Sequence, residues 1–272
     1  MFEFNALSPM KMILSGSQRL AAVFVLLWSA IVSAFVPVQT TQLESFGALH
    51  MAGGGMMDVA NFATQQAPQT TKFVTNKMCP FAQKVWIALE ASGAPYELEE
   101  VSLYGPNGKP DWFWELNPSG TVPVLVCHGG ATVYPDSDLA LDVIEDGSAI
   151  VGVTLNDKVK LDNSNKKLQA QIQEWRQSML NDKLLPIGKK AVLGGSKQKL
   201  YDVLQEMNGK VVGPFLCGEQ LTSADCAVFP FLWRLDNEYG MKKYPKLSAW
   251  LKHCNNHMAF SKTVQSAWWW WW

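Results

Sequence analysis

The sequence predicts two folded parts in series: an α/β domain over residues 71–147 and an all-α domain over residues 158–267. In the first part, short apolar or alternating segments typical of strands are interleaved with segments of helical periodicity. In the second part, apolar residues recur at helical spacing throughout. The chain has 272 residues, 48% of them hydrophobic, and is therefore long enough to bury two modest cores.

The α/β domain is predicted to begin with a strand over residues 71–74 and a helix that starts directly after Cys79. The apolar residues of that helix follow helical spacing: Phe81, Val85, Ala88 and Leu89. Pro80 suits the first helical position, and Gly93 is placed to end the helix. Cys79 is thus expected at a helix N-terminus, where unpaired N–H groups and the helix dipole can lower a cysteine pKa from ~8.5 to roughly 3.5–7.5. The alternative interpretation is a small buried residue without a chemical role.

Turn signals and hydrophobic patterns predict the remaining elements of this domain. Strands are expected at residues 96–101, 121–126 and 131–134, with a short helix at 111–116. The last two strands are expected to pair across the His128-Gly129-Gly130 turn. Asp136 and Ser137 can cap a final helix that ends at Gly147. This order of elements is the layout of a thioredoxin-like domain.

The second domain is predicted to be a set of packed amphipathic helices. Three apolar stripes follow helical spacing: Leu168, Ile172, Trp175 and Met179; Leu200, Val203, Leu204 and Met207; and Leu247, Trp250, Leu251 and Cys254. Residues 226–235 are apolar on nearly all sides, which predicts a helix buried at the centre. Thr222 and Asp225 form a capping box before it, and the loss of such a cap costs ~1 kcal/mol. Residues 147–155, between the two domains, are predicted as a strand.

Charge and cysteine content argue against several classes of function. A net charge of −1 gives no support for nucleic-acid binding, which usually needs a basic face. The five cysteines lack metal-ligand spacing and the four histidines do not pair with them, so no metal is predicted and reduced thiols are expected. Ala82 stands where a Cys-x-x-Cys redox pair would place its second cysteine. Disulfide chemistry at Cys79 would therefore be monothiol, with the resolving thiol supplied by a partner such as glutathione.

Several motifs occur together in one order along the chain. They are Cys79-Pro80-Phe81-Ala82, Lys109-Pro110-Asp111-Trp112-Phe113, Asn117-Pro118-Ser119-Gly120-Thr121-Val122-Pro123-Val124-Leu125 and Asp136-Ser137-Asp138, followed by the capped helix at 221–235. In this combination the chain resembles the cytosolic-type glutathione transferases, most of all the omega class and its relative dehydroascorbate reductase. The resemblance implies the glutathione transferase fold, with a thioredoxin-like α/β N-terminal domain and an all-α C-terminal domain.

The resemblance also implies a glutathione site. In the family, the cysteine that matches Cys79 forms a mixed disulfide with glutathione, and the proline that matches Pro123 follows a cis peptide bond. The N–H and C=O groups of Val122 would then pair with the cysteinyl part of glutathione. Phe81 belongs to the same site through its place in the cysteine motif.

The charged ends of glutathione are assigned to three further residues. Lys109 is expected to meet the glycyl carboxylate, and Asp136 the γ-glutamyl ammonium group. Ser137 and the helix N-terminus behind it would take the γ-glutamyl carboxylate. Simpler roles stay open: Lys109 as a solvated lysine, Ser137 as a helix cap and Pro123 as a strand-edge proline.

The resemblance favours a glutathione-dependent thiol transferase or dehydroascorbate reductase, with Cys79 as nucleophile and glutathione as co-substrate. Conjugation of glutathione to an electrophile is a weaker alternative, because it needs a hydroxyl to stabilise glutathione's own thiolate and Thr75 is not at the motif position. A non-catalytic member of the fold, with a regulatory or membrane-associated role, is the alternative from another class. A homodimer is compatible with each of these.

The ends of the chain carry separate signals. Residues 1–34 resemble a signal peptide, with Lys11 and Arg19 before a short apolar run at 20–32. Ala34-Phe35-Val36-Pro37 resembles the cleavage motif of bipartite presequences in algae with complex plastids, so residues 35–70 are interpreted as a transit-like or disordered segment. Plastid import is the leading expectation; the secretory pathway and the cytoplasm are the alternatives. The five tryptophans at 268–272 suggest membrane contact, refolding onto the protein or a partner.

Overall fold

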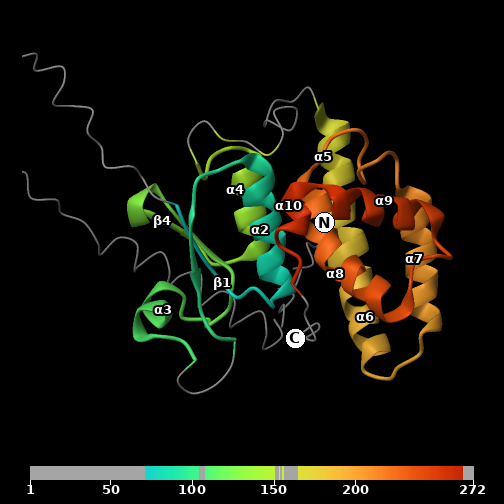
Figure 1. Cartoon of the computed structure of the whole chain (residues 1–272), viewed down its shortest axis with the longest axis horizontal. Helices are drawn as coiled ribbons and strands as arrows, with labels where there is room; N and C mark the ends of the chain where they lie inside the picture. The colour runs from blue at the N-terminus through green and yellow to red at the C-terminus, as the bar shows by residue number, and fades with distance from the viewer. Residues whose placement is uncertain (1–70, 104–107, 151–152, 154, 156–164, 266–272) are drawn as a thin grey trace, which may run out of the picture. The chain divides into compact units, whose positions relative to one another are not determined.

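The computed structural model describes residues 71–103, 108–150, 153, 155 and 165–265 (Figure 1). The predicted presequence (1–70) and the tryptophan tail (268–272) lie outside the described residues. All described residues belong to one compact unit of the chain. Within it, an α/β domain with a four-stranded sheet is followed by a helical domain, and this confirms the predicted fold class.

The sheet consists of β1 (Lys72–Thr75), β2 (Glu97–Glu100), β3 (Val124–Cys127) and β4 (Thr132–Tyr134), in the order β2-β1-β3-β4. Strand β1 runs parallel to β2 and antiparallel to β3. Strands β3 and β4 pair as a hairpin across the short 3-10 turn η2 (His128–Gly130). Phe73 of β1 lies opposite Leu125 of β3, and both are fully buried. The apolar strands therefore occupy the centre of the sheet, while β2, with three glutamates among its four residues, forms an edge.

Three helices complete the first domain: α2 (Pro80–Ser92), α3 (Asp111–Leu116) and α4 (Ser137–Glu145). Helix α2 starts with Pro80 at its first position and ends at Gly93, whose φ of +67° lies in the left-handed region that favours glycine. Helices α2 and α4 pack against each other. In Figure 1 they lie between the sheet and the helical domain, and α3 lies on the opposite side of the sheet. Helix α2 is therefore covered on both sides, and every residue from Pro80 to Leu89 except Phe81 is buried.

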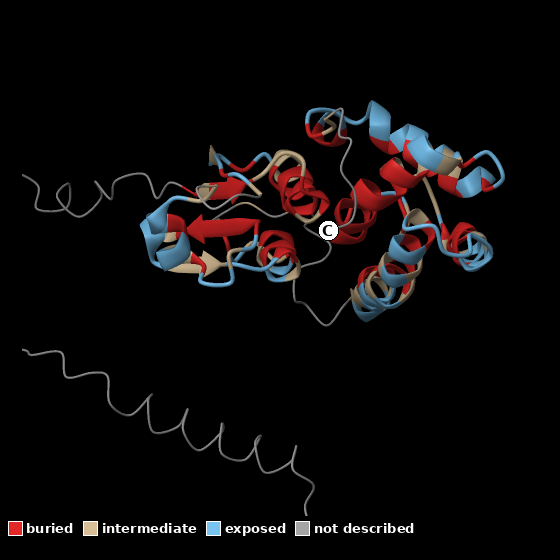
Figure 2. Ribbon diagram, turned by 90° about the horizontal axis from the view of Figure 1, so that it is seen from below, coloured by how far each residue is buried: buried red, intermediate tan, exposed pale blue. Residues whose placement is uncertain are grey.

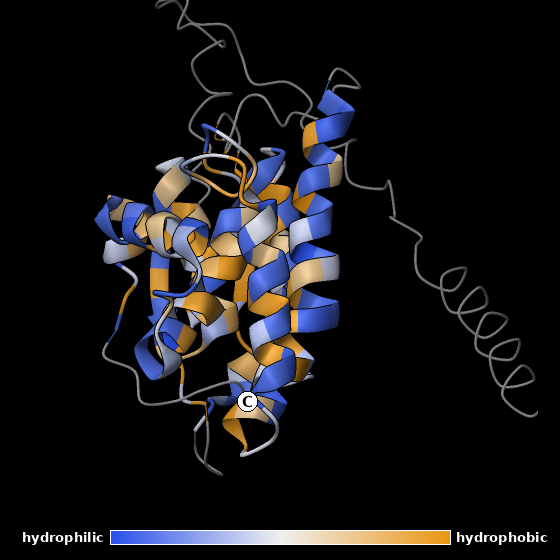
Figure 3. Ribbon diagram, turned by 90° about the vertical axis from the view of Figure 1, so that its right-hand side faces the viewer, coloured by the Kyte–Doolittle hydropathy of each residue, from blue (hydrophilic) through white to orange (hydrophobic). Residues whose placement is uncertain are grey.

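The second domain is built of helices, as predicted. They are α5 (Lys166–Gln173), the π-helical segment η5 (Glu174–Leu184), α6 (Leu185–Val192), α7 (Gln198–Lys210), α8 (Ser223–Tyr239), α9 (Pro245–Asn256) and α10 (Met258–Ser261). Segments α5, η5 and α6 follow one another without a break. Pro186, which has no N–H to donate, lies in the first turn of α6, directly after η5. Figure 3 shows the amphipathic pattern as alternating hydrophilic and hydrophobic bands along these helices.

Helix α8 is the buried central helix that the sequence predicts. Its residues from Ser223 to Leu235 are buried with the single exception of Trp233. The predicted capping box is confirmed: the side chain of Thr222 accepts from the N–H of Asp225, and the carboxylate of Asp225 accepts from the N–H of Thr222 at 3.0 Å. The same carboxylate also accepts from the Thr222 hydroxyl at 3.0 Å. Asp225 also accepts from the N–H of Leu216 and from the indole N–H of Trp250, each at 2.8 Å. One carboxylate therefore ties the start of α8 to the preceding loop and to α9.

The two domains meet along α8. It packs against α2, and buried residues concentrate where the helices of the two domains come together (Figure 2). At one end of this contact, the carboxylate of Glu145 on α4 accepts from the N–H of Ser223 at 2.9 Å and from its hydroxyl at 2.5 Å. An acidic group at a helix N-terminus is favourable for the helix dipole. The first domain thus helps to cap the central helix of the second.

The prediction of a strand at 147–155 is wrong for the part of that segment that the structure describes. Residues 147–150, 153 and 155 form turns and bends. Their N–H groups bond locally or back to α4: Ala149 to the carbonyl of Val143 at 2.9 Å, and Leu155 to that of Ile144 at 3.3 Å. The apolar alternation reflects packing of Ala149 and Ile150 against the core, without any strand partner among the described residues.

Candidate active site

Cys79 is the residue that immediately precedes α2, and a short network fixes its loop. The N–H of Cys79 donates to the carbonyl of Asn76 at 3.0 Å. The side chain of Asn76 accepts from the N–H of Met78 at 3.0 Å and donates to the carbonyl of Val101 at 2.9 Å. Cys79 has extended backbone dihedrals, and its carbonyl already accepts the first helical hydrogen bond, from Gln83 at 2.9 Å. The predicted placement at a strand–helix junction is therefore confirmed.

The thiol of Cys79 faces the loop that leads into β3. Its Sγ donates to the carbonyl of Val122 at 3.8 Å, across 43 residues of sequence. The Val122–Pro123 peptide bond is cis, as the resemblance implies. Cys79 and Val122 are each only 8% exposed. The structure thus brings together three of the predicted site residues.

The expectation of a lowered thiol pKa at Cys79 is wrong. Burial raises the pKa of Cys79 above its ordinary value, because a thiolate loses hydration there. The N–H groups of Ala82 and Phe81 and the cations of Arg234 and Lys84 lower the pKa, but they offset only part of the burial effect. The sequence shows the helix N-terminus but not the depth at which the sulfur is buried.

This balance predicts the pH dependence of Cys79 reactivity. Below its pKa the thiolate fraction rises about tenfold for each pH unit, so the rate of alkylation by iodoacetamide should rise by that factor. Because burial raises the pKa of this thiol above its ordinary value, we expect no plateau near neutral pH. Mass spectrometry of the Cys79 peptide measures the rate, with Cys79→Ser as the blank. A plateau near neutral pH would show that the thiol is instead acidic.

The start of α4 supplies a second predicted part of the site. Asp136 caps the helix: its Oδ1 accepts from the N–H groups of Asp138 at 2.8 Å and Leu139 at 3.0 Å. Both bonds use the same oxygen, so Oδ2 is available for an ammonium group. Ser137 is buried, and its hydroxyl accepts from Nζ of Lys84 at 3.2 Å. The capping role therefore belongs to Asp136, and the Ser137 hydroxyl is held by a lysine.

Lys84 is a feature that the sequence reasoning missed. Its side chain is 1% exposed, and its Nζ forms an ion pair with Asp138 at 2.7 Å. Burial lowers the pKa of Lys84, and Asp138 opposes that change. The ammonium group adds positive charge behind the start of α4, where an anionic group is expected to bind. A lysine inside a helix whose buried face is mostly apolar was the signal that could have identified it.

Arg234 is the second residue that was missed. It lies on α8, is 2% exposed, and donates from Nη2 to the carbonyl of Met78 at 3.3 Å. Its Nη1 donates to Oε1 of Gln83 at 2.7 Å. Met78 and Gln83 flank Cys79 in the chain, so the second domain reaches the candidate nucleophile. A lone arginine in the predicted buried helix at 226–235 was the available signal.

Two predicted residues lie at the margin of this arrangement. Lys109 is partly exposed, and its Nζ donates to the carbonyl of Leu103 at 3.0 Å. Phe81 packs edge-to-face on Phe231 of α8, with ring centroids 5.2 Å apart. Neither contact involves Cys79. The roles of Lys109 and Phe81 toward glutathione thus stay predictions.

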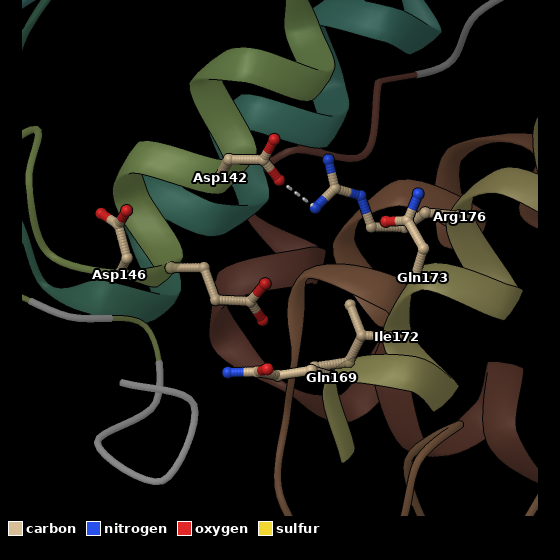
Figure 4. A pocket seen from close by; sticks show the side chains of 7 residues that line it. Asp142, Asp146, Gln169, Ile172, Gln173 and Arg176 are labelled. Carbon is tan, nitrogen blue, oxygen red and sulfur yellow. Dashed lines mark hydrogen bonds and ion pairs between the residues drawn. The ribbon is translucent and has the colours of Figure 1, made fainter. Parts of the chain in front are cut away.

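A cavity of about 370 Å³ lies beside α4 and α5, away from these residues. It is lined by Asp142, Glu145, Asp146, Gln169, Ile172, Gln173 and Arg176. Figure 4 shows the Asp142–Arg176 ion pair, which spans the two facing helices. None of the predicted glutathione-binding residues lines it. In the part of the chain that the structure describes, no group of three or more His, Cys, Asp or Glu side chains could hold a metal ion, and no helix has the length and apolarity of a membrane span.

Comparison with known protein families matches both domains. A model described as "Glutathione S-transferase, N-terminal domain" matches residues 78–146, which include Cys79, Val122 and Asp136. A second model, "Glutathione S-transferase, C-terminal domain", matches residues 193–253 and includes Arg234.

Curated relatives and solved structures agree with these matches. The "Probable glutathione S-transferase DHAR1, cytosolic" of Oryza sativa subsp. japonica is 30% identical over 58% of this chain and 67% of that protein. "Glutathione S-transferase omega-1" of Sus scrofa is 26% identical over 74% and 84% of the two chains. "Glutathione S-transferase DHAR3, chloroplastic" of Arabidopsis thaliana is 27% identical over 61% of this chain and 58% of that one. The crystal structure of glutathione transferase Omega 3C from Trametes versicolor superposes with a TM-score of 0.60 at 24% identity, covering 76% and 94% of the chains.

Proposed function

Because the chain belongs to the glutathione S-transferase family, we propose that it is a glutathione-dependent thiol transferase or dehydroascorbate reductase with Cys79 as its nucleophile. The observation that carries the proposal is a single thiol at the N-terminus of α2, facing the carbonyl of Val122, with Ala82 in place of a second cysteine. The chemistry therefore needs an external resolving thiol, and relatives named as glutathione S-transferases point to glutathione.

The proposed reaction proceeds by two thiol–disulfide exchanges. The Cys79 thiolate attacks the glutathione sulfur of a mixed disulfide between glutathione and a second thiol; the new S–S bond forms as the old one breaks, and the second thiol leaves as a thiolate that takes up a proton. A second glutathione thiolate then attacks the glutathione sulfur on Cys79 and releases oxidised glutathione and the Cys79 thiolate.

With dehydroascorbate, the Cys79 thiolate adds to a carbonyl carbon and the carbonyl oxygen takes up a proton. A glutathione thiolate then attacks the Cys79 sulfur, the C–S bond breaks, and ascorbate leaves with Cys79 in a mixed disulfide with glutathione. A second glutathione resolves that disulfide as above, so two glutathione molecules supply the two electrons and two protons. A thiolate of high pKa is scarce at neutral pH but intrinsically more nucleophilic.

The residues around Cys79 suit the groups of glutathione. The Val122 backbone, next to the sulfur, suits the cysteinyl unit. The free oxygen of Asp136 suits the γ-glutamyl ammonium group, and the start of α4 with Lys84 behind it suits the neighbouring carboxylate. Lys109 is proposed for the glycyl carboxylate.

The subcellular location of the protein is proposed from its first residues. Some relatives are chloroplastic by name. Together with the signal-peptide-like and transit-like segments at 1–34 and 35–70, this supports plastid import. A fluorescent reporter fused to residues 1–70 tests the proposed location, and a diffuse cytosolic signal would contradict plastid import.

Binding and turnover test the proposed function. The full chain should be retained on immobilised glutathione and should reduce hydroxyethyl disulfide or dehydroascorbate at the expense of glutathione. Asp136→Asn keeps an N-cap but removes the charge opposite the ammonium group, so we expect glutathione to bind about tenfold more weakly by calorimetry. Asp146→Asn, at the other end of the same helix, is the matched control and should bind like the parent. A folded chain that binds glutathione but reduces neither substrate would contradict the proposal.

A further inference from the structure

Arg234 is a buried cation that pairs with no carboxylate in the part of the chain that the structure describes. Two other buried cations have such partners: Lys84 pairs with Asp138 at 2.7 Å, and Arg176 pairs with Asp142 at 2.5 Å. Among the described residues, no Asp or Glu forms an ion pair with Arg234. Its neighbours are neutral: the Gln83 amide, the carbonyls of Met78 and Pro230, and the ring of Trp233 at 5.5 Å. A charge buried in this way is costly unless an opposite charge is present for part of the time.

Two of the groups that Arg234 contacts, Met78 and Gln83, lie on either side of Cys79 in the chain. Met78 immediately precedes Cys79, and the carbonyl of Cys79 accepts from the N–H of Gln83. Gln83 is itself locked, because its Nε2 donates to the carbonyl of Thr263 at 3.2 Å and to its hydroxyl at 3.3 Å. The guanidinium group is thus held at the start of α2 by contacts from α8 and from the segment after α10. Burial lowers the pKa of Arg234 to about 10, and only the Cys79 sulfur opposes this change.

We propose that Arg234 is the counter-ion of the Cys79 thiolate, supplied by the second domain as a positioning residue for the nucleophile of the first. The inference rests on the proposed function in that Cys79 must act as a thiolate. When Cys79 is protonated, the buried guanidinium has no anionic partner. When Cys79 ionises, sulfur and guanidinium form an ion pair in a site that excludes water, where the attraction is strong.

The same pair serves both exchanges. In the first, Arg234 favours the thiolate that attacks. In the second, glutathione breaks the Cys79–glutathione bond and Cys79 departs as a thiolate, so the same cation stabilises the leaving group; thiols of lower pKa leave faster. Between the two steps, while Cys79 is in the mixed disulfide, Arg234 is again without an anion.

The other charges near Cys79 do not replace Arg234. Lys84 of α2 also favours the thiolate, but it is committed to Asp138 of α4. Asp136, which caps α4, is not among the principal groups that change the pKa of Cys79. Lys262, after α10, pairs with Glu90 near the far end of α2, at 2.9 Å. Arg234 is therefore the cation whose removal should change Cys79 most.

The test is the pH profile of Cys79 alkylation in the full chain, measured without glutathione. An adjacent opposite charge typically shifts a pKa by about one to three units, so Arg234→Met should slow alkylation at neutral pH about tenfold or more. The deficit should shrink toward high pH, where both proteins are ionised. Arg234→Lys keeps the charge but loses the fork of donors, and should recover part of the rate. The ultraviolet absorbance of the thiolate, taken against Cys79→Ser, follows ionisation independently of alkylation.

Three outcomes decide the proposal. A profile shifted to higher pH in Arg234→Met, with partial recovery in Arg234→Lys, supports it. An equal slowing at every pH in both variants overturns it, because that is the result of altered packing alone. If Arg234→Met does not fold, Arg234→Lys is compared with Arg234→Gln, a neutral variant of similar polarity. Identical alkylation rates and inflection points in these two variants would overturn the role of charge. Because none of these measurements requires turnover, a chain that reduces no substrate would refute the proposed function without affecting them.

Discussion

Replacing Cys79 with serine is expected to abolish reduction of hydroxyethyl disulfide and of dehydroascorbate. A serine hydroxyl cannot form the S–S bond to glutathione, and no second cysteine lies at position 82 to substitute for it. The fold should persist, since serine is nearly isosteric and Cys79 contributes one weak hydrogen bond, to Val122 at 3.8 Å. Steady-state turnover, with circular dichroism as the check on folding, measures both effects.

Cys217→Ser is the matched control for this substitution. Cys217 is a half-buried thiol whose pKa is raised to about 12 by burial and by the Asp225 carboxylate, so it has little thiolate under assay conditions. We expect the control to keep parental turnover. Residual activity in Cys79→Ser at the level of the parent would show that another group performs the reaction.

The second large effect is expected on stability, at Asp225. Its carboxylate is fully buried and accepts hydrogen bonds from Leu216, Thr222 and Trp250. Asp225→Ala leaves these buried donors unpaired, and each unpaired group costs about 1–3 kcal/mol. We expect the free energy of unfolding to fall by about 3–5 kcal/mol, well above the ~1 kcal/mol of a helix cap alone. Urea titration followed by circular dichroism measures the change.

Asp202→Ala is the control for Asp225→Ala. Asp202 also lies on a helix of the second domain, but it is exposed, and its hydrogen bond within the described part of the chain comes from Gln198. Its replacement should change the free energy of unfolding by less than about 0.5 kcal/mol. Equal effects of the two substitutions would show that the network around Asp225 is not a principal support of α8.

The fold could be predicted from the sequence because its signals are local. Pro80 and Gly93 mark the ends of α2, the His128-Gly129-Gly130 turn joins β3 to β4, and Thr222 with Asp225 marks the start of α8. Ile172, Trp175 and Met179 are buried as predicted, whereas Leu168 of the same stripe is half-buried and π-helical turns interrupt the regular helix from Glu174. Hydrophobic spacing does not report such turns.

The candidate site was only partly predictable, because its energetics depend on contacts between distant residues. The helix N-terminus at Cys79 could be inferred from Pro80, but not the burial that raises the thiol pKa. Arg234 and Gln83 are 151 residues apart in the chain, and Lys84 and Ser137 are 53 apart. No local pattern pairs them. The alternation at 147–155 misled for the same reason: only the tertiary structure shows that the described part of this segment pairs with none of the four described strands.

The role of Cys79 is tested most directly by its reaction with oxidised glutathione. The reduced, full-length protein is incubated with oxidised glutathione, quenched with acid and examined by intact and peptide mass spectrometry. The proposed mechanism predicts one glutathione in disulfide linkage on the Cys79 peptide, removed by dithiothreitol and missing from Cys79→Ser. Absence of the adduct, or its appearance on Cys127, Cys217, Cys226 or Cys254 in place of Cys79, would contradict the assignment of Cys79 as the nucleophile.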